Sequence, residues 1–365
     1  MSSIWGERLK ISLFGESHGP AVGVVVDGFP PGMAVDFEKI NSEMERRMPK
    51  SAAYSTKRKE SDEVEILSGM YEGRTTGAPI CGLIRNTDTR SRDYEEISRL
   101  ARPGHADYTG YVRFGGYNDY RGGGHFSARL TAPLVFAGAL ARQFLEEKGI
   151  YIGSHIFSIG DVNDVAFDMT GITREQLDNL RKMELPVNDA SCAEEYLQLI
   201  DEARRDLDSV GGIIETAVIG IPAGIGTPYF SNVEGKLSSI MFSIPAVKGV
   251  EFGAGFSITK MWGSEANDSF CVDGGQVRTR TNNNGGINGG ITNGMPVVFR
   301  VAIKPTSSIA KAQDTVDIKK MENAVLEIRG RHDTCIVPRA VPVVEAACAI
   351  ALCDLYLAQF GYQRP

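Results

Sequence analysis

The sequence predicts a layered α/β protein whose chain has two similar halves, about 1–208 and 209–365. Strand-like runs alternate with helix-like segments, which is typical of sheets covered by helices. Residues 218–224 repeat the pattern of residues 26–32, an apolar run that ends in a turn with glycine and proline. In each half, an arginine-bearing loop leads into an apolar helix with proline near its start. We therefore expect a single domain, 1–365, with an internal repeat.

The first half is predicted to begin with strands at 11–14 and 22–26 and a turn at 27–32. Asp36 then suits the N-cap of a helix to about residue 48, because its side chain can accept from amides of the first turn. Segment 49–59 is polar and basic and is expected to be a mobile loop, whereas 91–100 is expected to be a polar helix or loop. The remaining elements expected are strands at 64–67, 79–84 and 150–159, and helices at 131–147, 173–183 and 193–208.

The second half is predicted to contain a helix at 237–244, strands at 250–258 and 296–303, and an apolar helix at 341–360. A glycine- and asparagine-rich run at 281–290 precedes the last strand, and a polar cluster at 329–333 precedes the last helix.

Composition excludes several classes of protein. The net charge of −7 argues against a general nucleic-acid binder. The six cysteines form no CxxC pair and mostly lie in apolar runs, as reduced thiols used in a core do. The first residues lack the apolar stretch of a signal peptide, and no run approaches the roughly 18 apolar residues of a membrane span. We expect a cytoplasmic protein without a membrane or nucleic-acid partner.

The chain is organised around residues 102–129, which hold seven glycines, four arginines and two of the five histidines. Glycine is used where the backbone must approach something closely or take a positive φ, so we expect no regular element here. The polar residues between the glycines are mostly able to bind anions or move protons. This combination indicates a phosphate-bearing ligand held by amides and guanidinium groups.

Two histidines are candidates for proton transfer. His18 lies between Gly15 and Gly19 and could act as a general acid to a departing phosphate, because its pKa lies near physiological pH. A Ser17–His18 nucleophile pair is the weaker alternative, since neighbouring residues of a strand point to opposite faces. His105 could be oriented by Asp107, the alternative being a loop histidine capped by a local aspartate.

Other clusters are more ambiguous. Residues 304–308 offer an ammonium and three hydroxyls for a phosphate, or form a simple turn at a strand end. The sequence lacks GxxxxGK[ST] and a GxGxxG after a strand, so a nucleotide site of the usual kind is not supported. A metal site from His332, Asp333 and Cys335 has suitable ligand types but no zinc spacing. His155, within a strand, is expected to be a core or edge histidine.

Five motifs, in order and over about residues 6–360, resemble those of the chorismate synthase family: 15–19 through 27–30, 102–107, 124–129, 304–308 and 331–333. The resemblance implies a β-α-β sandwich with internal pseudo-symmetry, assembled as a homotetramer. It also implies a lyase that uses reduced FMN to convert 5-enolpyruvylshikimate 3-phosphate to chorismate, by 1,4-anti elimination of phosphate and a ring proton, at the end of the shikimate pathway.

The resemblance also implies residue roles. His18 would protonate the departing phosphate, His105 would lie beside the reduced flavin and protonate it, and Asp333 would assist proton removal together with flavin N5. The implied substrate positions are Ser17, Arg47, Arg102, Ser127, Arg129 and Arg331. The implied flavin positions are His105, His125, Phe126, Ser127, Pro245, Ala246, Gly289, Lys304, Pro305, Thr306, Ser307, Ser308 and Arg331. No metal is implied.

The chain departs from the family pattern in two places. A second arginine usually follows Arg47 by about six residues, where this chain has Ala53, so Lys50 or Arg58 would have to substitute. His125 and Phe126 stand where many relatives have Arg-Ser. The sequence does not say whether the protein reduces its own flavin, with NADP as the associated nicotinamide, or depends on an external flavin reductase. The rival functions are a flavin-dependent oxidoreductase and a non-catalytic anion-binding protein.

Overall fold

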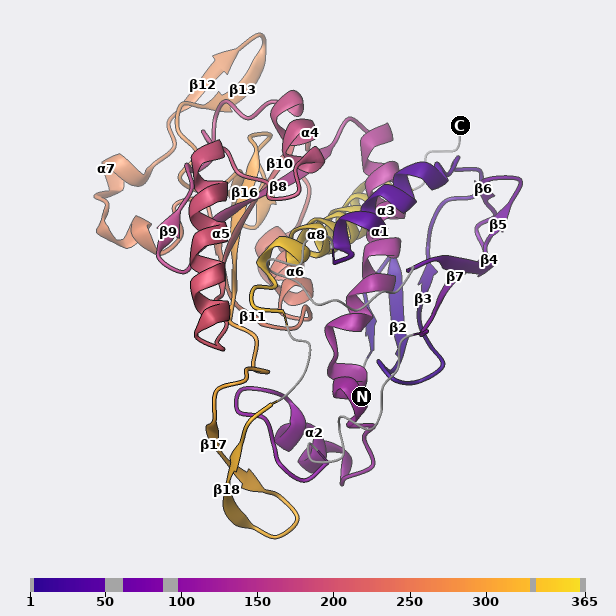
Figure 1. The fold of residues 1–365 in the computed structure, drawn as a ribbon. Helices are drawn as coiled ribbons and strands as arrows, with labels where there is room; N and C mark the ends of the chain where they lie inside the picture. Colours follow the sequence, from indigo (N-terminus) through magenta and orange to yellow (C-terminus); the bar gives the residue numbers. More distant parts are fainter. Residues whose placement is uncertain (1–2, 50–61, 88–97, 329–332, 362–365) are drawn as a thin grey trace.

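The computed structural model describes residues 3–49, 62–87, 98–328 and 333–361, and two five-stranded antiparallel sheets form its outer layers (Figure 1). The first sheet has the order β1 (Ile4–Trp5), β2 (Lys10–Gly15), β3 (Ala21–Asp27), β7 (Ile80–Arg85) and β4 (Val64–Ser68). The second has the order β11 (Val247–Phe252), β16 (Val297–Ile303), β10 (Gly212–Ile219), β8 (Tyr151–Ile159) and β9 (Val162–Asn163).

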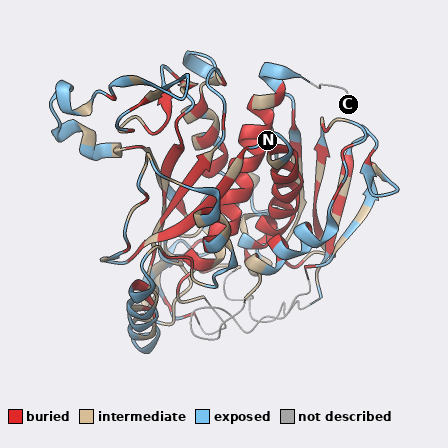
Figure 2. Cartoon of the chain, turned by 90° about the horizontal axis from the view of Figure 1, so that it is seen from above, coloured by how far each residue is buried: buried red, intermediate tan, exposed pale blue. Residues whose placement is uncertain are grey.

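Helices fill the space between the sheets. They are α1 (Phe37–Arg47), α3 (Thr131–Glu147), α6 (Val233–Met241) and α8 (Val337–Phe360). Figure 2 shows buried helices enclosed by the two sheets, so the predicted layered β-α-β sandwich is confirmed. The predicted cap of α1 is also confirmed, since Asp36 accepts hydrogen bonds from the amides of Glu38 and Lys39. The crossing of α3 and α8 requires Gly138, because a Cβ there would collide with Ala346.

Helix α8 is the one helix of the described ranges with the length and apolar composition to cross a membrane, yet 94% of its most apolar window is buried. A helix that is apolar all round suits the middle layer of a sandwich, where it contacts protein on every side. Its burial is explained by the core that it shares with α3 and the two sheets.

The outer face of the second sheet is covered by α4 (Arg174–Lys182). Ala217 and Val298 face α4, whereas their neighbours Val218 and Val297 face the central helices. Successive strand residues point to opposite faces, so these strands are apolar on both sides. Helix α5 (Ala190–Arg205) contacts β9 nearby.

Several expectations were wrong in detail. The organising stretch contains a regular helix, α2 (Asp107–Phe114), which ends at Gly115 in the left-handed conformation. Most glycines of the stretch follow α2 in the sequence, so they do not prevent this helix from forming. The strand expected at 250–258 ends at Phe252, and 3₁₀ backbone follows at Gly255–Lys260. The helix expected at 237–244 is α6, which begins earlier, where Asn232 caps it. Helix α8 begins four residues before the predicted start.

Small hairpins were not predicted. They are β5–β6 (Met70–Tyr71, Arg74–Thr75), β12–β13 (Phe270–Asp273, Gln276–Thr279), β14–β15 (Ile287–Asn288, Ile291–Thr292) and β17–β18 (Gln313–Asp317, Glu322–Leu326). All of the predicted loop 49–59 except Pro49, and residues 91–97 of the segment 91–100, lie outside the described residues. The strands of the first sheet end at residue 85, and those of the second begin at residue 151 with β8. Strand β8 therefore lies in the predicted first half of the chain but belongs to the second sheet. The equivalence of the two halves stays a prediction.

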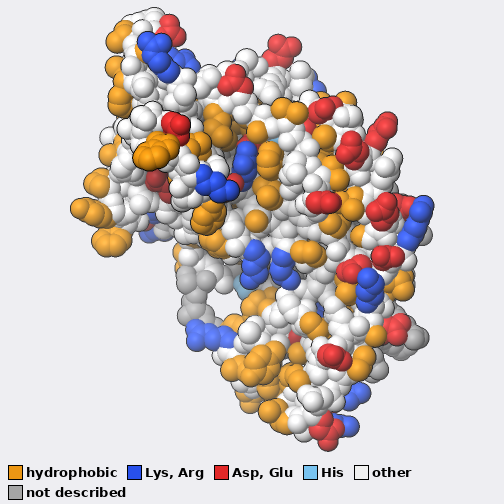
Figure 3. Space-filling view, turned by 90° about the vertical axis from the view of Figure 1, so that its left-hand side faces the viewer, with side chains coloured by type: hydrophobic (Ala, Val, Ile, Leu, Met, Phe, Trp, Pro, Cys, Tyr) orange, Lys and Arg blue, Asp and Glu red, His pale blue; other side chains and the backbone are white. Residues whose placement is uncertain are grey.

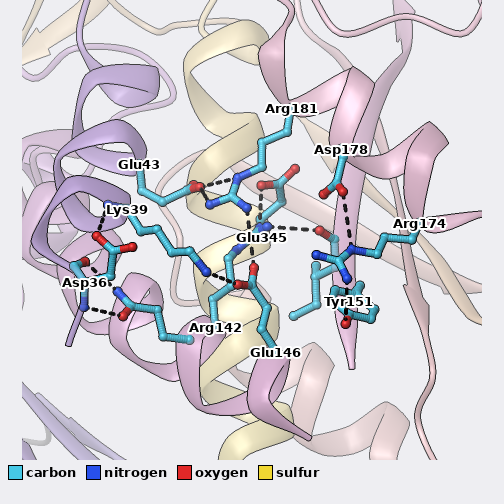
Figure 4. A network of polar contacts seen from close by, with 12 residues as sticks. Asp36, Lys39, Glu43, Arg142, Glu146, Tyr151, Arg174, Asp178, Arg181 and Glu345 are labelled. Atoms are coloured by element: carbon cyan, nitrogen blue, oxygen red, sulfur yellow. Dashed lines mark hydrogen bonds and ion pairs between the residues drawn. The ribbon is translucent and has the colours of Figure 1, made fainter. Parts of the chain in front are cut away.

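A buried ionic network joins α1, α3, α4 and α8 (Figure 4). Glu345 of α8 accepts hydrogen bonds from Arg46 of α1 at 2.6 Å and from Arg142 of α3 at 2.7 Å. Glu43 of α1 accepts from Arg46 and from Arg181 of α4. Burial alone would raise the pKa of Glu43, but the surrounding guanidinium groups outweigh it and lower the pKa to about 2. The network fixes the C-terminal end of α1, where Arg47 is placed.

His155 is a core histidine, as expected. It is fully buried in β8, with Nδ1 2.8 Å from Asp164 and Nε2 2.9 Å from Glu215. Burial disfavours its charged form, but the two carboxylates outweigh burial and raise the pKa of His155. Since both ring nitrogens are used inside the sheet, His155 stabilises the fold and lies outside the candidate site.

Candidate active site

The polar loops of the chain converge where α1 ends and where α3 and α8 begin. Arg47, the last residue of α1, donates from Nε to Thr131 Oγ1 of α3 at 3.0 Å. Its carbonyl accepts from Arg339 of α8 at 3.2 Å. Two helix N-termini therefore meet here, and their dipoles favour an anionic ligand.

A glycine run closes over both candidate histidines. Gly122, Gly123 and Gly124 all have positive φ, within a 3₁₀ segment at Arg121–Phe126. A Cβ at Gly122 would collide with the His18 ring, and one at Gly123 would lie 3.3 Å from His105 Nε2. The close approach explains the glycines, because any side chain would displace a ring. The structure thus brings His18 and His105 against consecutive residues of one loop, although 87 residues separate them in the chain.

Ser17 is fully buried beside His18. Its amide donates to the Gly124 carbonyl at 3.1 Å, which fastens the β2–β3 turn to the glycine run. Its hydroxyl is buried and has no hydrogen-bond partner among the described residues. A buried hydroxyl without a partner is costly, so Ser17 is a candidate to contact a polar ligand atom.

His105 is held by Asp107 and Arg102. The His105 Nδ1 atom lies 2.7 Å from Asp107 Oδ1 and 3.1 Å from Arg102 Nη2. Nδ1 cannot donate and accept at once, and the shorter contact favours an Nδ1–H donated to the carboxylate. Nε2 then faces Gly123 as the atom that can exchange a proton. Burial raises the pKa of Asp107, but hydrogen bonds from Arg102 and His105 outweigh this and hold the pKa well below its usual range. The predicted contact between Asp107 and His105 is confirmed.

Arg102 also links this cluster to the segment after β16. Its Nε and Nη2 form a fork on Asp107, at 2.7 and 2.8 Å, and its Nη1 donates to Ser308 Oγ at 3.2 Å. In the same segment, Lys304 Nζ donates to the Gly104 carbonyl at 2.8 Å and to Ser307 Oγ at 2.7 Å. Burial, with a contribution from Lys248, lowers the pKa of Lys304.

The Lys304 segment connects to two further predicted positions. The Lys304 amide donates to the Ala246 carbonyl at 2.9 Å, which places Pro245 and Ala246 beside it. Thr306 Oγ1 donates to the Asp333 carbonyl at 2.9 Å. The Asp333 carboxylate accepts from Arg339 Nη1 at 2.7 Å. Pro305 is exposed between these contacts.

Arg47 and Arg129 are brought together by a residue that sequence reasoning missed. Asp62, the residue two before β4, accepts from Arg47 Nη1 at 2.5 Å and from Arg129 Nη1. Arg129 also donates from Nε to Asn86 Oδ1 at 3.0 Å. All three charged side chains are buried. No local pattern marks Asp62, because it is one of three neighbouring acidic residues, with Glu60 and Glu63, between a basic segment and a strand.

The residues after the glycine run have different surroundings. Ser127 caps the 3₁₀ turn Ala128–Leu130 and accepts from the Arg129 amide. Phe126 packs on α2, with its ring 6.1 Å from that of Phe114. His125 is exposed, and its ring nitrogens contact the Gly15 carbonyl at 2.9 Å and Ser3 Oγ at 3.3 Å.

Two predicted positions are not joined to this cluster. Gly289 lies in the exposed β14–β15 turn, and the neighbouring Gly290 carbonyl accepts from the amide of Val233 at the start of α6. Arg331 lies outside the described residues, as do His332, Lys50, Ala53 and Arg58. Over the described ranges, no three His, Cys, Asp or Glu side chains form a metal-ion site. Cys335 is buried, which raises the pKa of its thiol to about 12.

Comparisons with known proteins agree on one family. A sequence profile described as chorismate synthase matches residues 9–357. The chain is 47% identical over 357 residues to a chorismate synthase of Dehalococcoides mccartyi, covering 98% of this chain and 97% of the relative. It is 49% identical over 358 residues to that of Thermococcus gammatolerans, covering 98% of both. A crystal structure of chorismate synthase aligns with a TM-score of 0.76 at 31% identity, covering 98% of this chain and 94% of that one.

Proposed function

The chain belongs to the chorismate synthase family of carbon–oxygen lyases, and from this premise we propose how its residues carry out the reaction. The substrate is 5-enolpyruvylshikimate 3-phosphate, and the product is chorismate. In the elimination, the ring C–O bond to phosphate breaks, a ring proton departs from the opposite side, and a new double bond forms. The observation that carries the assignment of residues is the pair His18 and His105, held against Gly122 and Gly123, with Arg102 in contact with His105.

The arginine groups are proposed to bind the substrate's anionic groups. Arg47, Arg102, Arg129 and Arg331 would contact its phosphate and carboxylates, with Ser17 and Ser127 as hydroxyl contacts. A phosphate that departs carries the electron pair of the broken bond, so its departure is favoured by fixed positive charge and by a proton. The His18 imidazole is proposed to supply that proton. Asp333, fixed by Arg339 and Thr306, is proposed to assist removal of the ring proton.

Reduced FMN is a property of the family, and the residues of this chain fit a phosphate-bearing cofactor. The Lys304 ammonium and the Ser307 hydroxyl lie beside Gly104, where a Cβ would be 3.4 Å from both Lys304 Nζ and Ser307 Oγ. We propose that this segment and Pro245–Ala246 hold the flavin, with Phe126 and His125 nearby and Gly289 and Arg331 as further contacts. Bound FMN would supply an electron-rich ring without net redox change. His105 Nε2 would exchange a proton beside it.

The test is an anaerobic assay. The purified protein would be mixed with chemically reduced FMN and 5-enolpyruvylshikimate 3-phosphate, and phosphate and chorismate would be measured together. We expect equal amounts of both products, with the flavin still reduced at the end. Net oxidation of the flavin in proportion to product would instead support a flavin-dependent oxidoreductase. Binding without phosphate release would support an anion-binding protein, and the absence of any binding would refute the proposal.

We also propose a homotetramer, on the basis of exposed hydrophobic side chains. They include Phe230, Phe256, Trp262, Phe270 and Val272, of which Phe256 is 82% and Trp262 is 78% exposed. Figure 3 shows hydrophobic side chains on the projecting part of one face of the molecule. Large exposed apolar patches are rare on monomeric proteins and mark interaction surfaces.

Sedimentation equilibrium should give four times the chain mass of 39.6 kDa. The double substitution Phe256→Ser and Trp262→Ser is expected to lower that mass, because it removes apolar area from the expected interface. A monomeric wild-type protein would contradict the proposal. A double variant that stays tetrameric would show that these two residues lie outside the interface. An external flavin reductase would be a separate partner, detectable as a requirement for turnover when oxidised FMN and NADPH are supplied.

A further inference from the structure

Asp62 is the feature of the site that the proposed function does not use. It is 3% exposed, and its two carboxylate oxygens serve two different arginines. Oδ2 accepts from Arg47 at the end of α1, and Oδ1 accepts from Arg129 in the 3₁₀ turn before α3. The three residues come from three separate segments of the chain, so Asp62 is the point at which these segments meet.

The charges explain why a carboxylate is needed between these arginines. The side chains of Arg47 and Arg129 are both 5% exposed, and two buried guanidinium groups so close together would repel each other. One carboxylate shared by both reduces this repulsion, so Asp62 allows the two buried guanidinium groups to lie side by side.

The remaining contacts fix each guanidinium from other directions. Arg47 Nε donates to Thr131 Oγ1 at 3.0 Å. Arg129 Nε donates to Asn86 Oδ1 at 3.0 Å, and its Nη2 donates to the Arg85 carbonyl at 3.3 Å. These partners belong to α3 and to the end of β7, which are regular elements. With Asp62 in place, both guanidinium planes are set before any ligand binds, and preorganised binding groups lose less entropy on association.

The backbone of Asp62 supports a specific role. Its φ is +47°, a left-handed conformation that costs free energy for any residue other than glycine, although aspartate tolerates it better than most. Such an outlier persists where the surroundings require it, and outliers of this kind gather at functional sites. Here the conformation directs the side chain inward between the two arginines.

We propose that Asp62 is a positioning residue for substrate binding: it holds Arg47 and Arg129 as one preset anion-binding pair. The inference rests on the proposed function, since these arginines are taken as contacts of 5-enolpyruvylshikimate 3-phosphate. Burial opposes the alternative that Asp62 occupies the substrate's own place until it is displaced, because a placeholder would lie where the ligand enters. The two ideas predict opposite changes in substrate affinity.

The test is Asp62→Asn, which keeps the size of the side chain and removes its charge. The interaction is made in the ground state and the transition state alike, so we expect KM for the substrate to rise at least about tenfold with kcat nearly unchanged. The affinity for FMN should stay at the wild-type value. The matched control is Glu65→Gln, which removes a carboxylate of β4 from its exposed pair with Arg85 of the neighbouring strand β7 and should change neither constant.

Calorimetric titration of substrate without flavin distinguishes failure of the proposed function from failure of the positioning role of Asp62. If the wild-type protein neither binds nor converts the substrate, the proposed function fails. If the wild-type protein binds it and Asp62→Asn binds it equally well or more tightly, the positioning role is overturned. Should Asp62→Asn not fold, Asp62→Glu keeps the charge but shifts it by one methylene, and the same rise in KM is expected. Wild-type affinity in that variant, or failure of both variants to fold, would refute a role specific to the arginines.

Discussion

Alanine at either active-site histidine, His18→Ala or His105→Ala, is expected to lower kcat by about 10²–10⁴-fold, the usual contribution of a positioned general acid or base. His18 is proposed to protonate the departing phosphate, and His105 Nε2 is the ring atom turned toward the glycine run. Since neither ring belongs to the core, both variants should fold. Binding of substrate should persist because the arginines are unchanged. Single-turnover measurement of phosphate release with reduced FMN would give the rates.

A further substitution, Asp107→Asn, tests the role of the aspartate beside His105. Asp107→Asn removes the partner of His105 Nδ1 and should lower kcat by roughly 10–100-fold, as loss of an orienting hydrogen bond often does. It should have little further effect in the His105→Ala background, because the two residues then act as one unit. Tyr117, 96% exposed near the same loop, provides a control, and Tyr117→Ala should leave kcat unchanged. Folded histidine variants with kcat within about threefold of wild type would contradict the proton-transfer roles.

The sequence predicted the central architecture because its signals are local. The apolar helices α3 and α8 and the strands β2, β3, β8 and β16 show continuous hydrophobic or strand-forming runs, which a single stretch of sequence suffices to reveal. The small hairpins were missed, since their strands of two to five residues are stabilised by contacts that a periodicity does not contain. Helix α2 was missed because glycines outside it dominated the composition of the stretch.

Some contacts of the candidate site could likewise be predicted from the sequence, and others could not. His105 and Asp107 are two residues apart, and their contact was anticipated from that spacing. The closure of Gly122 on His18 was not, because it depends on how the β2–β3 turn meets a loop about 100 residues later. Asp62 and Arg339 were missed for the same reason. Each is defined by partners in other segments, and nothing in the adjacent residues distinguishes them from ordinary surface charges.

Glu345→Gln is expected to lower the free energy of unfolding by about 3–5 kcal/mol, the cost of removing one partner from a buried ion pair. Glu345 is fully buried and accepts from Arg46 and Arg142, so the substitution would leave two buried guanidinium groups sharing a neutral amide. The exposed substitution Glu65→Gln should leave the free energy of unfolding nearly unchanged, because water already solvates that pair. Urea unfolding at one fixed protein concentration would compare the two variants.

The Glu345→Gln variant should also show whether the buried ionic network helps to position Arg47 for substrate binding. Arg46 and Arg47 are consecutive at the end of α1, so the network that holds Arg46 determines where the guanidinium of Arg47 lies. Under conditions where Glu345→Gln remains folded, we expect a higher KM for substrate, with His105 chemistry and therefore kcat less affected. Equal loss of stability in Glu345→Gln and Glu65→Gln would mean that water reaches the buried network. A destabilised variant with wild-type KM would instead show that Thr131 and Asp62 suffice to position Arg47 without support from α8.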